Sequence, residues 1–295
     1  MKTIMILLRL YFNVLSVVAP KLAATQAIRL FQKTQKNKVK PRETSFYQYT
    51  RHFQVPSEVE DINCFEMGPE DGKLVLLVHG WNSRAGSMAA IGFRLMKKGY
   101  RVIGIDLPGH GISKLSHTNL IVESKGLQAV IEYLNPQEPI SVIAHSFGSA
   151  VSSFTLSQME VEVDNLIYLT TPNKMEEVFE NYGAEIGLSA RAFRHMEQIF
   201  ISIFDKSWSE FVMRDFTKQF DYQSLLLIHD KFDRVIPYKN SVDFAENLYH
   251  ARLHSLEKAG HYRMLWDKDV IDVIADEFEG ERACTNEEKI LAAAF

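Results

Sequence analysis

The sequence is poor in cysteine, contains no long apolar run and carries no overall excess of positive charge. Among its 295 residues, Cys64 and Cys284 are the two cysteines, too few for a disulfide framework and not spaced as metal ligands. No apolar run reaches the ~18 residues that a membrane-spanning helix needs. The net charge of −4 does not favour nucleic acid as a partner. These absences indicate a globular protein of a reducing compartment such as the cytoplasm.

Acidic residues are missing from the start of the chain. The first 42 residues hold nine of the 33 Lys and Arg residues and none of the 37 Asp and Glu residues. Residues 2–19 are largely apolar, Pro20 ends this segment, and residues 23–35 predict a second short helix. A signal peptide is disfavoured because Arg9 splits the apolar run and no clean cleavage site follows. The remaining alternatives are a helical extension packed on the main domain, with a solvated basic linker, or peripheral contact of residues 1–42 with the inner face of a membrane.

From residue 50 onward, short apolar runs alternate with helical patterns. Strands are predicted at residues 53–55, 61–67, 73–78, 101–105, 140–144, 165–169, 224–229 and 252–256. Helices are predicted at residues 84–98, 120–134, 147–159, 241–248 and 267–278. The first two strands suit an antiparallel pair, and the others are near-continuous apolar runs. This alternation predicts an α/β fold with a mostly parallel sheet that helices cover on both faces.

The strand rhythm stops between residues 173 and 221. Helical patterns replace it at residues 175–186, 190–204 and 208–219. We expect this insertion to lie above the carboxyl ends of the strands, where open α/β sheets bind ligands. We expect four parts in the chain. They are a helical, basic extension at 1–45, a core at 46–172 and 222–280, a helical cap at 173–221, and a tail at 281–295.

The stretch around Ser146 is the centre of the functional interpretation. A buried strand ending near Ala144 is followed by a tight turn at Ser146 and a helix that starts near Phe147. Ala144 and Gly148 keep the positions two residues before and after the serine small. This is the Gly-x-Ser-x-Gly pattern of a nucleophile elbow, with alanine in place of the first glycine. The start of the helix also directs free N–H groups toward whatever is bound at the serine.

A serine hydroxyl needs a base to take its proton, and the base needs a third group to orient it. Two carboxylates, Asp230 and Asp233, follow the predicted strand 224–229, and His261 follows the last strand behind Gly260. Either carboxylate could be the orienting acid. No third ligand accompanies any histidine pair at suitable spacing, so no metal and no cofactor are expected.

Five motifs, each at a predicted strand end, carry a resemblance to a known family. They are His79-Gly80-Trp81, Asp106-Leu107-Pro108-Gly109-His110-Gly111, Ala144-His145-Ser146-Phe147-Gly148, His229 to Pro237 by way of Asp233, and Gly260-His261. In this order they resemble the α/β-hydrolase fold superfamily over about residues 60–280, in its cap-bearing branch of esterases, lipases and C–C bond hydrolases. The N-terminal helices resemble, more weakly, those of bacterial hydrolases of the superfamily.

The resemblance implies a role for each matching residue. Ser146 would be the nucleophile, His261 the base and acid, and Asp233 its orienter. The backbone N–H groups of Trp81 and Phe147 would hold the oxyanion. Asp233 is favoured over Asp230 because its spacing to Val235 and Pro237 matches the family pattern. Asp230 is the alternative, and it stands where the family usually has glycine.

The implied activity is that of a serine hydrolase, with a carboxylesterase on small to medium apolar esters as the favoured form. Thioesterase and C–C bond hydrolase chemistry are the alternatives, because fold does not fix substrate. A hypothesis of another class is a non-catalytic ligand-binding protein on a hydrolase frame. The expected partner is thus a small-molecule ester or thioester, and the sequence does not indicate the oligomeric state.

Overall fold

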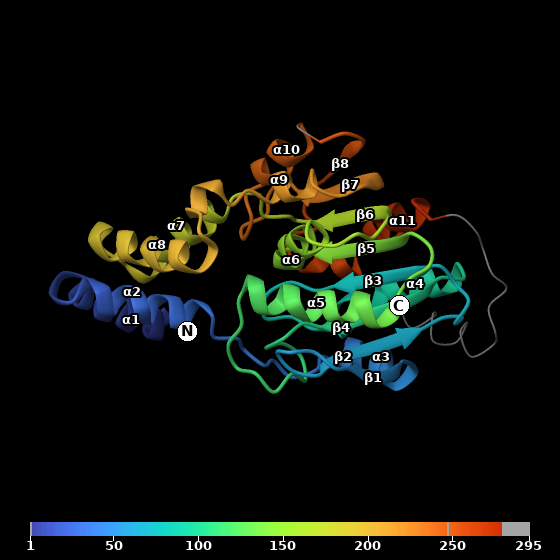
Figure 1. The fold of residues 1–295 in the computed structure, drawn as a ribbon, viewed down its shortest axis with the longest axis horizontal. Helices are drawn as coiled ribbons and strands as arrows, with labels where there is room; N and C mark the ends of the chain where they lie inside the picture. Colours follow the sequence, from blue (N-terminus) through green and yellow to red (C-terminus); the bar gives the residue numbers. More distant parts are fainter. Residues whose placement is uncertain (1, 247, 279–295) are drawn as a thin grey trace. The chain divides into compact units, whose positions relative to one another are not determined.

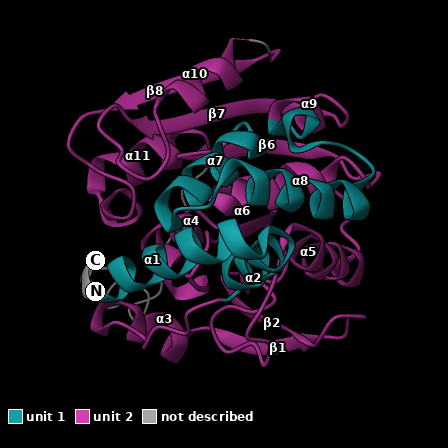
Figure 2. Cartoon of the chain, turned by 90° about the vertical axis from the view of Figure 1, so that its left-hand side faces the viewer, with its two compact units in different colours: residues 1–33, 173–213 teal, residues 34–172, 214–295 magenta. Residues whose placement is uncertain are grey.

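The computed structural model describes residues 2–246 and 248–278, which fall into two compact units. Unit 1 is assembled from two stretches that are far apart in the sequence, residues 1–33 and 173–213, and unit 2 comprises residues 34–172 and 214–295 (Figure 2). The N-terminal helices therefore share a compact unit with the insertion. The sequence pattern predicts these as separate segments, and the expected tail at 281–295 lies outside the described residues.

Unit 2 is built on one eight-stranded sheet (Figure 1). Its strands are β1 (Arg51–Val55), β2 (Ile62–Met67), β3 (Leu74–Val78), β4 (Arg101–Asp106), β5 (Ile140–His145), β6 (Val163–Leu169), β7 (Tyr222–Asp230) and β8 (Ala251–Leu256). The spatial order is β1-β2-β4-β3-β5-β6-β7-β8. Strand β2 pairs antiparallel with β1 and β4, and all the other pairs are parallel. The expected α/β fold with a mostly parallel sheet is confirmed.

Helices cover both faces of this sheet, because successive strand residues point to opposite faces and both sets are apolar. Helices α4 and α11 pack together on one face, over a core that includes Leu77, Ile143 and Ile274 (Figure 1). Helices α5 and α6 pack together on the other face. The helices of unit 2 are α3 (Thr44–Tyr49), α4 (Ala89–Lys97), α5 (Leu120–Leu134), α6 (Phe147–Leu156), α9 (Met213–Thr217, which begins at the boundary with unit 1), α10 (Lys239–Ala245) and α11 (Lys268–Asp276), with 3-10 turns at Pro41–Glu43, Ala85–Met88 and Arg263–Trp266.

Unit 1 consists of helices α1 (Lys2–Val18), α2 (Pro20–Phe31), α7 (Met175–Ile186) and α8 (Ala190–Phe204), and a 3-10 turn at Trp208–Glu210. The small residues Ala23, Ala24 and Ala27 are fully buried, and they let α2 approach α8 closely. Tyr182 of α7 donates a hydrogen bond to the carbonyl oxygen of Ala27 at 2.8 Å. Aromatic rings of α7, α8 and the 3-10 turn complete the core of unit 1. Among the described residues, no helix combines the length and apolarity that crossing a bilayer would take.

One predicted helix of the insertion, at residues 208–219, is wrong. The structure has the 3-10 turn, a bridge residue at Val212 and then the short helix α9. Here Val212 forms an isolated antiparallel bridge with Lys174, and Met213 donates a backbone hydrogen bond to Asn173 at 2.7 Å. The two ends of the insertion therefore pair with each other, and this pairing competes with the helix that the local pattern favours.

Candidate active site

Ser146 lies in a strained turn between β5 and α6. Its φ of 53° and ψ of −124° are unusual for a residue with a side chain, a conformation that costs about 1–3 kcal/mol and persists only where the surroundings fix it. The backbone N–H of Ser146 donates to the carbonyl oxygen of Leu169 on β6 at 2.8 Å. A Cβ on Gly148 would lie 2.4 Å from the carbonyl oxygen of His79, which explains why this turn needs glycine there.

Three loops at the carboxyl ends of β5, β7 and β8 bring Ser146, Asp233 and His261 together. The Nε2 atom of His261 lies 3.0 Å from the Ser146 hydroxyl, and its Nδ1 atom lies 2.7 Å from Oδ2 of Asp233. Ser146 and His261 are buried, with 7% and 6% of their surface exposed. These distances are those of a nucleophile, a base and an orienting acid.

Hydrogen bonds determine where the protons lie in the series Ser146, His261 and Asp233. Burial by itself raises the pKa of Asp233, but hydrogen bonds and charge from His261, and backbone N–H groups, outweigh it and lower the pKa. Val235 and Ile236 provide those N–H groups, both donated to Oδ1 at 2.7 and 3.1 Å. An ionised Asp233 can only accept at Oδ2, so the Nδ1 atom of His261 donates to it. The Nε2 atom is then left to accept the proton of Ser146.

The second carboxylate, that of Asp230 at the end of β7, binds backbone groups and not the histidine. Asp230 accepts the backbone N–H of Phe232 at 2.7 Å and that of Gly260 at 2.8 Å. Both of its oxygens are thereby used by the backbone, and the second bond ties the β7 loop to the loop that carries His261. The structure therefore places Asp233, and not Asp230, against His261.

The β3 loop approaches the serine closely. A Cβ on Gly80 would lie 2.9 Å from the Cβ of Ser146, so only glycine fits at this position. Trp81 follows, and its ring packs edge-on against the ring of Phe147 at a centroid distance of 5.3 Å. The two residues predicted to supply the oxyanion N–H groups are thus neighbours.

A neutral histidine anchors this loop. The Nε2 atom of His79 accepts the backbone N–H of Leu107 at 3.1 Å, so its proton resides on Nδ1, which donates to the carbonyl oxygen of Gly80 at 2.8 Å. Complete burial, together with the nearby His110, lowers the pKa of His79 well below its usual value. His79 is therefore a structural residue that holds the β3 loop against the β4 loop.

His145, which precedes the nucleophile, contacts the loop of His261. Its Nε2 atom donates to the carbonyl oxygen of His261 at 2.8 Å, and the two imidazole rings lie 4.9 Å apart. Burial, with repulsion from His261, lowers the pKa of His145 to about 3, so the ring is neutral. The side chain positions the backbone of the candidate base.

The segment that follows α2 makes a set of contacts that the sequence did not predict. Asn82, next to Trp81, has a φ of 54° and accepts the backbone N–H of Gln35 at 2.7 Å. Thr34 donates to the carbonyl oxygen of Gly109 at 2.7 Å and is buried. The start of the predicted solvated linker is therefore attached to the β3 and β4 loops. No local signal marks it, because the partners are 47 and 75 residues away.

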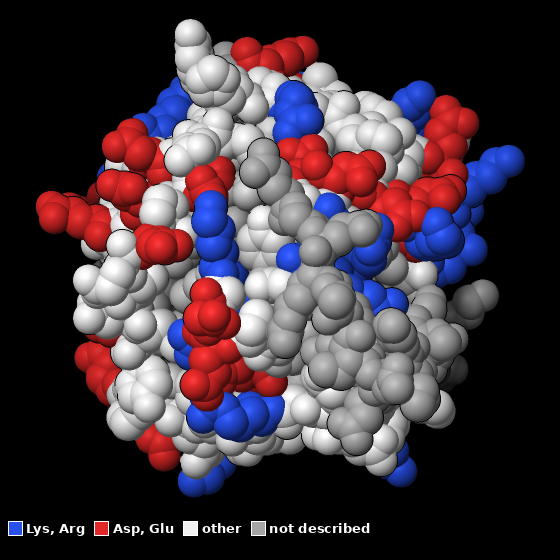
Figure 3. Space-filling model, turned by 90° about the vertical axis from the view of Figure 1, so that its right-hand side faces the viewer, with Lys and Arg blue, Asp and Glu red and all other residues white. Residues whose placement is uncertain are grey.

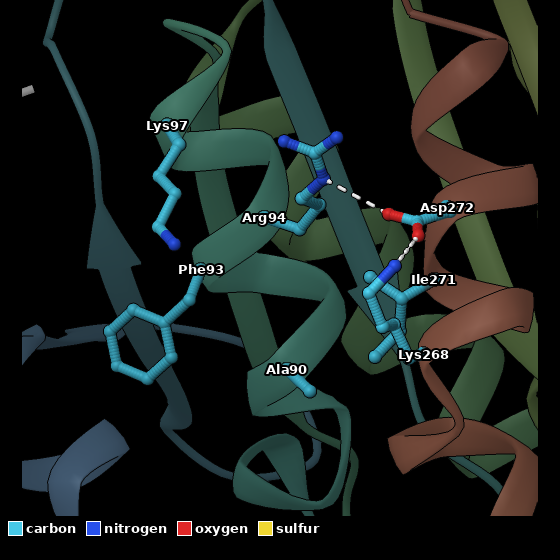
Figure 4. Close-up of a pocket in the computed structure, with 7 residues that line it drawn as sticks. All are labelled: Ala90, Phe93, Arg94, Lys97, Lys268, Ile271 and Asp272. Carbon is cyan, nitrogen blue, oxygen red and sulfur yellow. Dashed lines mark hydrogen bonds and ion pairs between the residues drawn. The ribbon is translucent and has the colours of Figure 1, made fainter. Parts of the chain in front are cut away.

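Two surface pockets of unit 2 are separate from these loops. One of about 350 Å³ lies between α4 and α11, where Asp272 pairs with Arg94 and Lys268 (Figure 4). The other, of about 800 Å³, is lined by residues at the amino ends of several parallel strands, including Lys73 and Asp164. The molecular face in Figure 3 carries cationic side chains next to anionic ones, as solvated surfaces commonly do. Among the described residues, no group of three His, Cys, Asp or Glu side chains is arranged to hold a metal ion.

Known proteins resemble this chain in sequence and in fold. A family model described as serine aminopeptidase, S33, matches residues 69–203, a region that includes Ser146. An esterase from Pyrococcus furiosus superimposes with a TM-score of 0.62 at 20% identity, over 83% of this chain and 96% of that one. The chain has the α/β-hydrolase fold. A further structural relative of this α/β-hydrolase is the thioesterase domain from the curacin biosynthetic pathway, with a TM-score of 0.57 at 16% identity, over 77% of this chain and 98% of that one.

A sequence relative of this α/β-hydrolase is a serine hydrolase-like protein of Dictyostelium discoideum. It is 29% identical over 117 residues, which are 37% of this chain and 32% of that protein. The chain spans less than half the length of the curated relatives that it matches. These comparisons support a hydrolase and leave its nucleophile and substrate to be derived from the site.

Proposed function

We propose that this α/β-hydrolase is a serine hydrolase that forms an acyl-enzyme on Ser146, and that it acts as a carboxylesterase on small to medium apolar esters. The observation that carries this proposal is the continuous hydrogen-bonded line from the Ser146 hydroxyl through His261 to Asp233. Its chemistry needs no metal and no cofactor.

The reaction follows from the protonation of that line. His261 takes the proton of Ser146 at Nε2 as the hydroxyl attacks the ester carbonyl, and Asp233 stabilises the imidazolium that forms. The backbone N–H groups of Trp81 and Phe147 hold the oxyanion, and loss of one such donor costs about 10²–10³ in rate. His261 then protonates the leaving alcohol and activates a water for deacylation.

A thioesterase is the second candidate, supported by the likeness to the curacin thioesterase domain. The same line of residues would serve either reaction, since both proceed through an acyl-enzyme. A panel of acyl and thioacyl substrates with graded chain length, compared by kcat/KM, separates the two. C–C bond hydrolase chemistry is a further alternative, because the fold does not determine the substrate.

The decisive experiment is labelling with a fluorophosphonate probe, which reacts with an activated serine. The native protein should label, and the Ser146→Ala variant should not. Ser149→Ala is a matched control, because Ser149 is three residues further on, and its hydroxyl donates to the carbonyl oxygen of Ser146 at 2.6 Å. A folded native protein that fails to label would favour the ligand-binding alternative over the enzyme.

A further inference from the structure

Helix α1 presents an apolar face that the described residues of unit 1 leave uncovered. Its buried side is formed around Phe12 and Ser16. On other sides, large apolar side chains are exposed, and Val17 and Val18 at the end of the helix are exposed to 75% and 77%. The exposed apolar residues of α1 and the start of α2 are Ile4, Ile6, Leu7, Leu10, Tyr11, Val14, Val17, Val18 and Leu22. Contiguous apolar surface of this kind marks an interaction site in soluble proteins.

The spacing of these residues defines a continuous stripe. Ile4, Leu7, Tyr11, Val14 and Val18 recur every three or four residues, so they lie along one side of the helix. Seventeen residues make α1 about 25 Å long at ~1.5 Å per residue. No described helix could cross a bilayer, so a lipid contact would place α1 in the plane of the surface.

The charged residues of α1 and α2 are of one sign. Lys21 and Arg29 on α2 are exposed, whereas Arg9 lies on the opposite side of α1, where its side chain approaches Gly187. The first 42 residues contain no Asp or Glu that could neutralise them. Helices α1 and α2 lie side by side in unit 1 (Figure 1), so the charges that these two helices themselves place beside the stripe are positive.

We propose that α1 docks in the plane of an anionic phospholipid membrane, with the stripe from Ile4 to Val18 in the headgroup region and the neighbouring cations on the lipid phosphates and carboxylates. A symmetric contact with a second copy is less well matched. It would bring two cationic helix pairs together without an acidic partner from residues 1–42. Anionic headgroups supply the counter-charge that this segment lacks. The inference is independent of the reaction proposed above.

The test is co-sedimentation of the full chain with large vesicles of phosphatidylcholine, with or without phosphatidylserine. The native protein should sediment with the anionic vesicles and less with the neutral ones. Binding should weaken as salt rises, because the screening length falls from about 10 Å at 0.1 M to about 3 Å at 1 M. Val18→Asp, at the most exposed stripe position, should reduce vesicle partitioning about tenfold or more.

Val39→Asp is the matched control. Val39 is exposed and belongs to the same basic segment, but it lies in unit 2 and outside the stripe. Val39→Asp therefore makes the same change in charge as Val18→Asp without altering the stripe. It should reduce binding much less than Val18→Asp does. Circular dichroism and ester turnover without vesicles should be unchanged in both variants.

Three results would overturn the proposal. The first is equal sedimentation of the native protein with and without anionic vesicles. The second is equal loss of binding in the Val18→Asp and Val39→Asp variants. The third is a concentration-dependent dimer in light scattering that Val18→Asp dissociates while vesicles bind neither form. That last result would assign the stripe to a second copy.

Discussion

Replacing Asp233 by asparagine tests the proposed mechanism most directly. The amide oxygen of the new side chain can keep the backbone hydrogen bonds from Val235 and Ile236, which now reach Oδ1 at 2.7 and 3.1 Å. The amide NH₂ group then faces Nδ1 of His261, which lies 2.7 Å from Oδ2 in the native protein. Since NH₂ can only donate, Nδ1 must accept and the imidazole proton moves to Nε2. In that tautomer His261 cannot take the proton of Ser146.

The expected loss is large and lies in kcat. The same wrong-tautomer change in a serine protease lowers kcat by about 10⁴, which corresponds to about 5.4 kcal/mol of transition-state stabilisation. Stability should change little, because the buried backbone donors keep their acceptor. The assay is kcat and KM on p-nitrophenyl esters, together with the rate of fluorophosphonate labelling.

Asp230→Asn is the matched control for this variant. Asp230 accepts a backbone N–H group at each of its two oxygens. In the asparagine variant, the side-chain NH₂ group replaces one oxygen and faces the backbone N–H of Phe232 or of Gly260, so two donors meet without an acceptor. We expect a loss of about 1–3 kcal/mol in the free energy of unfolding and a much smaller loss in kcat than for Asp233→Asn. If Asp233→Asn kept its activity within tenfold, or if Asp230→Asn lost as much activity with its fold intact, the assignment of the orienting acid would be refuted.

Three further changes probe the surroundings of the site. Gly148→Ala should lower the free energy of unfolding by about 1–3 kcal/mol, measured by urea denaturation, because its Cβ would meet backbone oxygens 2.4 and 2.5 Å away that cannot rotate aside. Asn82→Gly keeps the positive φ but loses the bond to Gln35, so kcat on esters should fall several-fold in a protein that stays folded at the assay temperature. Unchanged turnover would show that this bond does not hold the β3 loop in place. His145→Gln should reduce the pH dependence of stability. The pKa of His145 in the folded protein, about 3, lies below the usual ~6.5, so the unfolded chain binds the proton first as the pH falls. The contribution of His145 to the free energy of unfolding therefore decreases by about 1.4 kcal/mol for each pH unit from pH 6 down to pH 4. Equal slopes in native and variant urea titrations would contradict the buried, neutral state of the ring.

The proximity of Ser146, Asp233 and His261 could be predicted from the sequence because the elements that carry them obey local rules. Parallel strands end at the same edge of a sheet, so a serine, an aspartate and a histidine that each follow a strand are brought together there. Helix α5 was predicted at its observed bounds, since Asn119 caps its start with a bond to Val122 and Asn135 ends it in the left-handed region. These signals depend on neighbours in the chain and not on the fold.

The parts that the sequence did not predict depend on distant partners. The alanines of α2 carry no sign that α8 will cover them, and the helical pattern after Trp208 gives no sign that Val212 will bridge to Lys174. The same holds for Gln35, whose partner Asn82 becomes an acceptor only once the β3 loop has folded. Each feature is decided by which surface the segment meets.

The two aspartates of the β7 loop show why sequence alone left the acid open. Asp230 is the last residue of β7 and Asp233 lies three residues further on, so both are close to the neighbouring strand end that carries His261. What separates them is the use of their oxygens by the backbone: Asp230 gives both to N–H groups, whereas Asp233 gives one and keeps the other for His261. The nearby His229 does not compete for that oxygen, because its Nε2 proton is donated to the carbonyl oxygen of Ile236. One carboxylate oxygen is therefore reserved for the imidazole, and this arrangement of backbone donors, more than the spacing of acidic residues, gives Asp233 the role of orienter in the proposed mechanism.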